Sequence, residues 1–239
     1  MYCYTLKDNE KKEDLHFETD PAAFYPTDTS TLLIKAGRRV ISSPKKILDL
    51  GCGVGVVGLV MARLGYAQGP LFGSDINETA ISLAQKNARQ HNIPCDYRVG
   101  SLFEPWEGEF FDVIIDDVAG ISDDIAKLSG WYPPGVECNA GRDGTKWIVN
   151  VIKDSGRYLS AGGMIIFPTL SLSNEEKILQ EASQRYVHHE LILKQDWFVP
   201  DDLLQHKDLL MDLMADGSIR CQEKFGRLMW STSVYRAWN

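Results

Sequence analysis

The stretch ILDLGCGVGVVGL, residues 47–59, decides the fold class of this chain. A short apolar run ends in closely spaced glycines, and an apolar segment with helical spacing follows. Glycines between a strand and a helix let the backbone approach a ligand and direct helix N–H groups toward it. Residues 53–58 fit G-x-G-x-x-G, residues 49–55 fit D-x-G-x-G-x-G, and Asp75 follows about 20 residues later. The stretch therefore predicts a nucleoside-binding turn in an α/β sheet.

Asp49 helps to choose between the two glycine patterns. An acid at the end of the first strand would repel the pyrophosphate of NAD at the adjacent helix N-terminus, because like charges repel at close range. The same acid suits a ligand that carries a sulfonium and an ammonium, as S-adenosylmethionine does. Asp75, at the end of the second strand, can accept hydrogen bonds from both ribose hydroxyls of either ligand. The turn therefore favours S-adenosylmethionine over NAD.

The rest of the chain alternates strand-like and helical segments, which is typical of a doubly wound parallel sheet. Asn77 can cap the helix after the second strand, and the segment 92–94 (NIP) can end it. Beyond residue 186, two long strand-like runs enclose a helical insert over 201–216. Because no long crossover separates those two runs, we expect an antiparallel addition at the end of the sheet. The earlier strands are expected at 45–51, 69–76, 95–101, 110–117 and 162–168.

From about Phe24 to Phe167 the sequence resembles the class I S-adenosylmethionine-dependent methyltransferases. Residues 49–55 match the first motif of that family, and Asp75 matches its ribose-binding acid. Residues 99–103 resemble the third motif, with Ser101 where the family usually carries an acid, and residues 111–117 (FDVIIDD) stand where the fourth is expected. The resemblance implies an enzyme with S-adenosylmethionine as cofactor. It also implies a Rossmann-like, doubly wound α/β sheet of seven strands, mostly parallel with an antiparallel last strand.

The cofactor-binding residues implied by the resemblance are Tyr25, Thr29, Asp49, Gly51, Cys52, Gly53, Gly55, Asp75, Ile76, Ser101, Leu102 and Asp117. We expect a single domain over 1–239. It would comprise an N-terminal extension over 1–23, a cofactor-binding core over 24–168 and a C-terminal part over 169–239.

Two further segments resemble the HemK-like branch, which methylates glutamine amides and planar amines. Residues 24–29 (FYPTDT) resemble the segment that helps to enclose the cofactor, and residues 140–144 (AGRDG) resemble the G-x-D-G before the fifth strand. The NPPY motif of this branch is missing, since the aligned residues 117–120 read DVAG. Only the acid remains, as in the DPPY of DNA amino-methyltransferases; the stacking ring and the prolines are absent, which argues against a planar amide or base as the acceptor.

Asp117 is the candidate catalytic residue. It stands at the carboxyl end of a central strand, where α/β folds bind ligands. Since strand side chains alternate, Asp116 and Asp117 point in opposite directions, and the alignment favours Asp117 as the one that faces the cleft. It would act either as a general base, worth about 10²–10⁴-fold, or only as a group that orients the ligands.

The acceptor pocket is expected beside a long loop over 123–143. Trp131 and Tyr132 are the candidate acceptor-binding residues, whereas we expect Trp147 to pack internally. The insert over 201–216 places Leu203, His206, Leu210 and Met214 near one helix face, as a core stripe that could also belong to a lid or a dimer contact. His188 and His189 have no partners at metal-ligand spacing, and we expect no metal.

Charge and composition bound the function classes. The chain has 33 acidic and 25 basic residues, a net charge of −8, which argues against a broad surface for duplex DNA. The five scattered cysteines indicate a reduced chain, and the start lacks a signal-peptide core, so we expect a cytoplasmic protein without a membrane segment.

The expected function is methyl transfer to a nitrogen or oxygen of a small-molecule acceptor. HemK-like methylation of a protein or RNA group remains open as an alternative. Outside that class, a methyltransferase-like binding protein without activity and an NAD-dependent oxidoreductase remain open.

Overall fold

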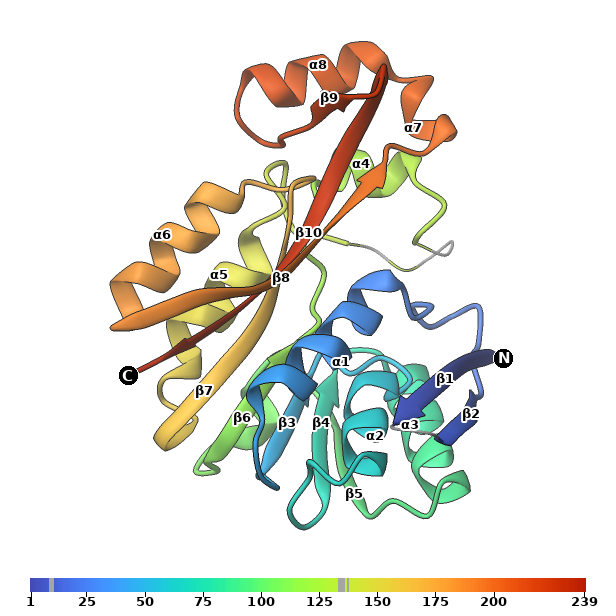
Figure 1. The fold of residues 1–239 in the computed structure, drawn as a ribbon, viewed down its shortest axis with the longest axis vertical. Helices are drawn as coiled ribbons and strands as arrows, with labels where there is room; N and C mark the ends of the chain where they lie inside the picture. Colours follow the sequence, from blue (N-terminus) through green and yellow to red (C-terminus); the bar gives the residue numbers. More distant parts are fainter. Residues whose placement is uncertain (9–10, 133–135, 137) are drawn as a thin grey trace.

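The central sheet of the computed structural model, which describes residues 1–8, 11–132, 136 and 138–239, has helices on both faces (Figure 1). Within those residues its main path holds seven strands in the order β5-β4-β3-β6-β7-β10-β8. The strands β3 to β7 run parallel, and β10 is antiparallel to both β7 and β8. The predicted seven-stranded, mostly parallel sheet with an antiparallel last strand is confirmed. Their bounds are β3 Ile47–Leu50, β4 Leu71–Asp75, β5 Cys95–Val99, β6 Phe111–Asp116, β7 Leu159–Leu170, β8 His188–Phe198 and β10 Arg227–Trp238.

Two helix layers sandwich the sheet. One layer contains α1 (Asp28–Val40), α2 (Val56–Arg63) and α3 (Glu78–Gln90), and the other contains the 3-10 helix η1 (Glu104–Trp106), α5 (Lys146–Ser155) and α6 (Glu175–Arg185). Asn77 caps α3 as predicted, because its side chain accepts a hydrogen bond from the Ala80 N–H at 3.1 Å. The chain leaves α3 through Asn92, whose φ is 55°.

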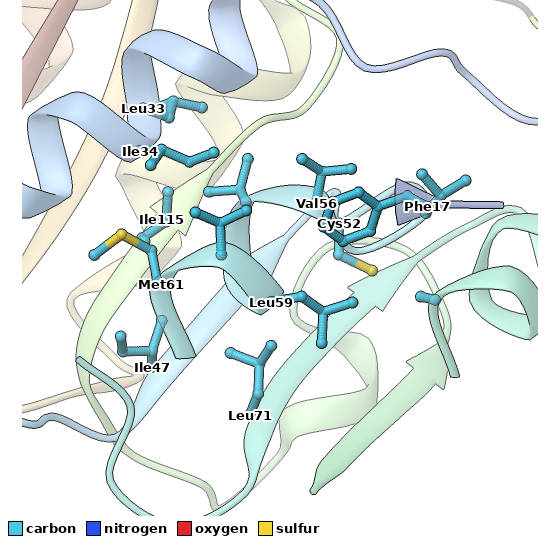
Figure 2. Packing of buried hydrophobic residues seen from close by; sticks show 14 of the residues in the cluster. Phe17, Leu33, Ile34, Ile47, Cys52, Val56, Leu59, Met61, Leu71 and Ile115 are labelled. Carbon is cyan, nitrogen blue, oxygen red and sulfur yellow. The ribbon is translucent and has the colours of Figure 1, made fainter. Parts of the chain in front are cut away.

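Strand alternation divides the core between the two layers. Val113 and Ile115 of β6 pack with α1 and α2, while Ile114 between them packs with α5. Figure 2 shows Ile34 of α1 and Met61 of α2 in the first of these clusters, near Ile115. Each such fully buried aliphatic side chain contributes about 1.5–3 kcal/mol relative to an exposed one. This packing holds the strands whose carboxyl ends carry the site.

A third hydrophobic cluster lies beyond the carboxyl ends of the strands, where α4, α7 and α8 gather (Figure 1). The insert over 201–216 is not one helix but two, α7 (Asp201–Leu204) and α8 (Lys207–Ala215). The break changes the helical phase, so the buried stripe is Leu203, Leu210 and Leu213, whereas His206 is exposed. The short strand β9 (Gln222–Lys224) follows and pairs with β10 outside the main path.

The segment 123–143 is only partly a loop, because α4 (Asp123–Leu128) forms at its start. The Asp123 carboxylate accepts hydrogen bonds from the N–H groups of Ala140 (2.7 Å) and Gly141 (3.0 Å), which ties α4 to the AGRDG segment. Gly144 has φ of 66°, and a Cβ there would lie 2.5 Å from the Ile121 carbonyl carbon. The AGRDG segment therefore packs closely on the turn after β6. Residues 133–135 and 137 lie outside the described residues.

The N-terminal residues form a hairpin that the sequence reasoning did not predict. Strands β1 (Tyr2–Asp8) and β2 (Lys11–Phe17) pair antiparallel in a separate sheet. Leu6, Leu15 and Phe17 are buried and join the cluster of α1, α2 and α3. Over the described residues, the helices are all too short or too polar to span a membrane.

Candidate cofactor and acceptor site

A cavity of about 650 Å³ opens at the carboxyl ends of the parallel strands. Its walls come from the start of α1, the glycine turn after β3, the ends of β4 and β6, and aromatic residues of the C-terminal strands. Ligands bind at this edge in α/β sheets, and the volume lies within the range of small-molecule sites.

The glycine turn combines an open wall with a tight packing contact. Gly51, Gly53 and Gly55 all have positive φ (72°, 51° and 87°). A Cβ on Gly53 would meet nothing within 4 Å, and Gly53 lines the cavity, so the backbone is open to a ligand there. Gly55 lies outside the cavity lining, and a Cβ on it would stand 2.9 Å from the Tyr97 hydroxyl oxygen. Gly55 is thus required by packing and not by direct contact with the cavity.

Asp75 lines the cavity at the end of β4 and organises the turn. Its Oδ2 accepts a hydrogen bond from the Gly53 N–H and its Oδ1 one from the Asn77 N–H, both at 2.9 Å. Burial raises the pKa of this carboxyl, while these backbone bonds oppose the rise. Each carboxylate oxygen has two lone pairs, so both can still accept a hydroxyl. Ile76 beside it also lines the cavity.

Asp49 lies beneath the turn instead of on the cavity wall. It is fully buried, its Oδ2 accepts a hydrogen bond from the Gly58 N–H at 2.8 Å, and its Oδ1 has no partner among the described residues. Burial raises its pKa to about 7, and the charges of Asp117 and Asp75 add to the rise. Because Asp49 does not line the cavity, it can act on a bound cation only by electrostatic attraction at a distance and not by direct contact.

The third-motif residues and Cys52 also lie on the cavity. Ser101 and Leu102 line it, and the Ser101 N–H donates to Glu104 at 3.0 Å. Cys52 is buried in the turn, and burial raises the pKa of its thiol well above the usual value. The cofactor-side residues predicted from the sequence are therefore brought together, with exceptions for Asp49, Gly55 and Tyr25.

Tyr25 points away from the cavity. Its hydroxyl lies 3.4 Å from the Met1 carbonyl oxygen, and its ring packs edge-on against Tyr2 with 5.6 Å between centroids. Its neighbours Phe24 and Pro26 line the cavity in its place, and so does Thr29. Thr27 of the same segment also lines the cavity, so among residues 24–29 Tyr25 alone turns away from it. The expected role of this segment thus rests on Phe24 and Pro26.

Asp117 lines the cavity directly after β6. Its Oδ2 accepts a hydrogen bond from the Ser30 hydroxyl at 2.7 Å, which links it to α1 across 87 residues of sequence. Burial raises its pKa to about 6, and the Ser30 bond limits the rise. Asp116 points into the protein instead: it is fully buried, and its Oδ2 has no partner among the described residues. The alternation of the two acids agrees with strand geometry.

Aromatic side chains build the opposite wall. Trp131 and Trp230 lie 5.4 Å apart between ring centroids, and Trp197 lies 6.2 Å from Trp230, its partner in the β8–β10 register. Tyr132 packs on Phe24 at 4.9 Å. All five rings line the cavity. The aromatic wall is therefore assembled from four separate parts of the chain.

Sequence reasoning missed several residues of this wall. Trp197 lies near the end of one strand-like run and Trp230 near the start of the next, and their place beside the helical insert was the available signal. Trp147 packs against the third hydrophobic cluster, as predicted, and its Nε1–H donates to the Cys138 carbonyl at 3.1 Å, but it also lines the cavity. Ser30, the partner of Asp117, carried no motif signal. Phe198 and Pro200 also line the cavity.

Comparison with known proteins agrees with this geometry. A family model described as a methyltransferase domain matches residues 41–208. The chain belongs to this methyltransferase family. It is 25% identical, over 71% of its length and 83% of the relative, to a candidate protein N5-glutamine methyltransferase of Methanocaldococcus jannaschii. It is 26% identical to the release factor glutamine methyltransferase of Geobacter sulfurreducens, over 69% of this chain and 59% of that protein.

A solved structure shares the fold of this methyltransferase. It is a T. thermophilus 16S rRNA N2 methyltransferase in complex with AdoMet and guanosine, with a TM-score of 0.58 and 13% identity. The match covers 100% of this chain and 50% of that one. With the family established, S-adenosylmethionine is the methyl donor of this enzyme. The residues present fit that cofactor, because the open backbone at Gly53 and the Asp75 carboxylate lie together on the cavity wall.

Proposed function

We propose that this methyltransferase transfers the methyl group of S-adenosylmethionine to a nitrogen atom presented by a protein. The observation that carries the proposal is the place of Asp117. The residue after it, Val118, lies against the glycine turn, since a Cβ on Gly51 would stand 2.9 Å from Val118 Cγ1. Residues 119–121 then continue along the cavity that the aromatic side chains line. An acceptor held at Asp117 would thus reach both walls.

The named relatives support a protein acceptor over an RNA acceptor. Both carry names that refer to glutamine methylation of proteins. The chain carries a net charge of −8, and no Lys, Arg or His occurs among the described residues that line the cavity. Phosphate groups bind to clustered positive charge, so an RNA strand would find no such group at the cavity.

Different residues of the site would bind the cofactor and orient the acceptor. Asp75 and the Gly53 backbone bind and orient S-adenosylmethionine, which supplies a methyl group already activated by its sulfonium. Holding acceptor and methyl in line can supply about 7–11 kcal/mol of the barrier. Asp117, fixed by Ser30, orients the acceptor nitrogen and accepts its proton where one must leave, which adds about 10²–10⁴-fold.

A small-molecule acceptor with a nitrogen or oxygen nucleophile is the second candidate. The turn after β6 favours it: residues 117–120 read DVAG, with neither the ring nor the prolines by which the HemK-like turn holds a glutamine amide. Mostly apolar cavities with a few polar groups are typical of small-molecule sites.

Methyl-labelled S-adenosylmethionine separates these candidates. The purified enzyme is incubated with an extract of the organism that encodes it, either whole or freed of small molecules by gel filtration. In the filtered extract we expect label in the material that acid precipitates. Protease treatment should remove this label, and ribonuclease treatment should not. Label that disappears on filtration would instead support the small-molecule acceptor, and ribonuclease-sensitive label would contradict both. At a limiting concentration of S-adenosylmethionine, the variant Asp75→Asn should strongly reduce the label, whereas Asp208→Asn, which changes an exposed acid of α8, should not.

A further inference from the structure

The charges around the cavity are all of one sign. Among the described residues that line it, the ionisable carboxylates are Asp28, Asp75 and Asp117, and there is no basic side chain. Asp75 lies on the glycine-turn side of the cavity, where its carboxylate accepts a hydrogen bond from the Gly53 N–H. Asp117 lies at the start of the turn that leads toward the aromatic wall. An acceptor with a negative charge would be repelled by each of these groups, and a positive charge would be attracted.

The aromatic wall also favours a positively charged acceptor. Trp131, Trp197 and Trp230 form a continuous group of indoles on the cavity, with 5.4 and 6.2 Å between neighbouring centroids. Indole faces carry negative electrostatic potential and attract ammonium groups, most strongly where water is excluded. Neutral amides gain no such attraction.

The Asp117 carboxylate completes a site for a cation. One of its oxygens is held by the Ser30 hydroxyl at 2.7 Å, which fixes the direction of the group. Residues 118–120 of the neighbouring turn are Val, Ala and Gly, so they carry no side-chain donor for an amide oxygen. An amide needs acceptors for its N–H groups and a donor for its carbonyl oxygen, while an ammonium needs acceptors and aromatic faces only.

We propose that the acceptor is an amine on an apolar framework, and that it enters the cavity as its ammonium ion between Asp117 and the indoles of Trp131, Trp197 and Trp230. This inference rests on the proposed methylation of a nitrogen atom and names its class. The Asp117 carboxylate accepts one proton from the ammonium, which leaves a neutral amine with a free electron pair. That pair forms the new N–C bond to the methyl group as the C–S bond breaks and its electrons stay on sulfur. The products are the methylated ammonium and S-adenosylhomocysteine, and Asp117 returns its proton to solvent.

Binding of three matched probes tests the preference without any turnover. Benzylammonium, benzamide and benzoate share one ring and differ in charge, and tryptophan fluorescence can report their binding because four of the six tryptophans line the cavity. With S-adenosylhomocysteine present, we expect benzylammonium to bind at least about tenfold more tightly than benzamide, as a charge-assisted contact implies. Benzoate should bind most weakly. Equal or tighter binding of benzamide by the wild-type protein would overturn the proposal.

Two variants assign the preference to Asp117. Asp117→Asn keeps an oxygen that can accept the Ser30 hydrogen bond but removes the charge, so the preference for benzylammonium over benzamide should disappear. Asp208→Asn removes a carboxylate charge at an exposed position of α8 and should keep the preference for benzylammonium. A full preference in a folded Asp117→Asn protein, with an unchanged melting temperature, would contradict the assignment.

The chemistry of the labelled product separates this inference from the proposed function. Acid hydrolysis of a methylated amide releases methylamine, whereas a methylated amine remains on its amino acid. Labelled protein that releases methylamine would overturn the amine acceptor and leave protein methylation standing. Absence of any labelled protein would overturn the proposed function and leave the probe affinities as the measure of the amine site.

Discussion

Replacing Asp49 by Asn is expected to reduce the pH dependence of stability of the ligand-free protein between pH 5 and pH 8. Asp49 is fully buried, and burial raises its pKa to about 7. The native state therefore holds this proton more tightly than the unfolded chain does. Between about pH 4 and pH 7 the native state binds more protons, so the free energy of unfolding falls as the pH rises.

The size of the effect follows from the pKa difference. A rise from the ordinary value of 3.8 to about 7 corresponds to about 4 kcal/mol, at about 1.4 kcal/mol for each pH unit. The Asn side chain cannot ionise, and its oxygen can still accept the Gly58 N–H. Its amide nitrogen, however, would be buried without a partner where Oδ1 now lies, at a cost of about 1–3 kcal/mol. By pH 5 about 1.5–2 kcal/mol of this difference is already lost, so the variant should lie within about 1.5 kcal/mol of wild type at pH 5 and be about 1–3 kcal/mol more stable at pH 8.

Urea unfolding at pH 5, 6, 7 and 8 without cofactor measures this difference. The free energy of unfolding of Asp49→Asn should rise relative to that of wild type by about 2–3 kcal/mol from pH 5 to pH 8, with an unchanged slope against urea concentration. Asp208→Asn, at an exposed position, should follow the wild-type curve. If the wild-type and Asp49→Asn curves ran parallel from pH 5 to pH 8, Asp49 would have an ordinary pKa and the reasoning from burial would be refuted.

Three further changes test the cofactor side and the core. Asp75→Asn should weaken S-adenosylhomocysteine binding about 10- to 100-fold, since bonds to a charged acceptor contribute about 1.5–3 kcal/mol; an unchanged Kd by calorimetry would remove Asp75 from ribose recognition. Gly55→Ala should lower the free energy of unfolding by more than the roughly 1–2 kcal/mol of left-handed strain, because its Cβ would lie 2.9 Å from the Tyr97 hydroxyl; wild-type stability in urea would contradict this. Trp106→Phe should cost about 1–3 kcal/mol, since the buried indole N–H donates to Ser74 at 3.0 Å, and a cost below about 0.5 kcal/mol would show that this bond adds little.

The sheet could be predicted from the sequence because its signals are local. Each central strand is a short apolar run, the glycine turn marks the first strand–helix junction, and Asn77 marks the start of a helix. The hairpin of β1 and β2 carries a weaker signal, since Tyr2, Tyr4 and Leu6 alternate with polar residues in a charged segment. It buries those side chains against distant helices, which no local pattern records.

Parts of the site could be predicted where a motif marks them, and Trp131 and Tyr132 from their place in the segment after β6. Motif matching located Asp49, Gly55 and Asp75 in the turn but could not tell which side chains reach the cavity. The aromatic wall depends on strand register, because Trp197 and Trp230 become neighbours only when β8 pairs with β10. Ser30 reaches Asp117 through the packing of α1 on the sheet. Both contacts depend on tertiary packing and have no local sequence signature.

The insert α7–α8 connects the two strands that carry Trp197 and Trp230. The length and packing of the insert therefore influence the positions of these two indoles. The glycine turn and Asp75 lie in a different part of the chain and do not depend on it. Evolution could therefore retune what the enzyme accepts by changing this insert while leaving the methyl-donor site untouched. A chimera that exchanges residues 197–230 between related enzymes would exploit the same separation, and it offers a practical route to methyltransferases with redesigned selectivity.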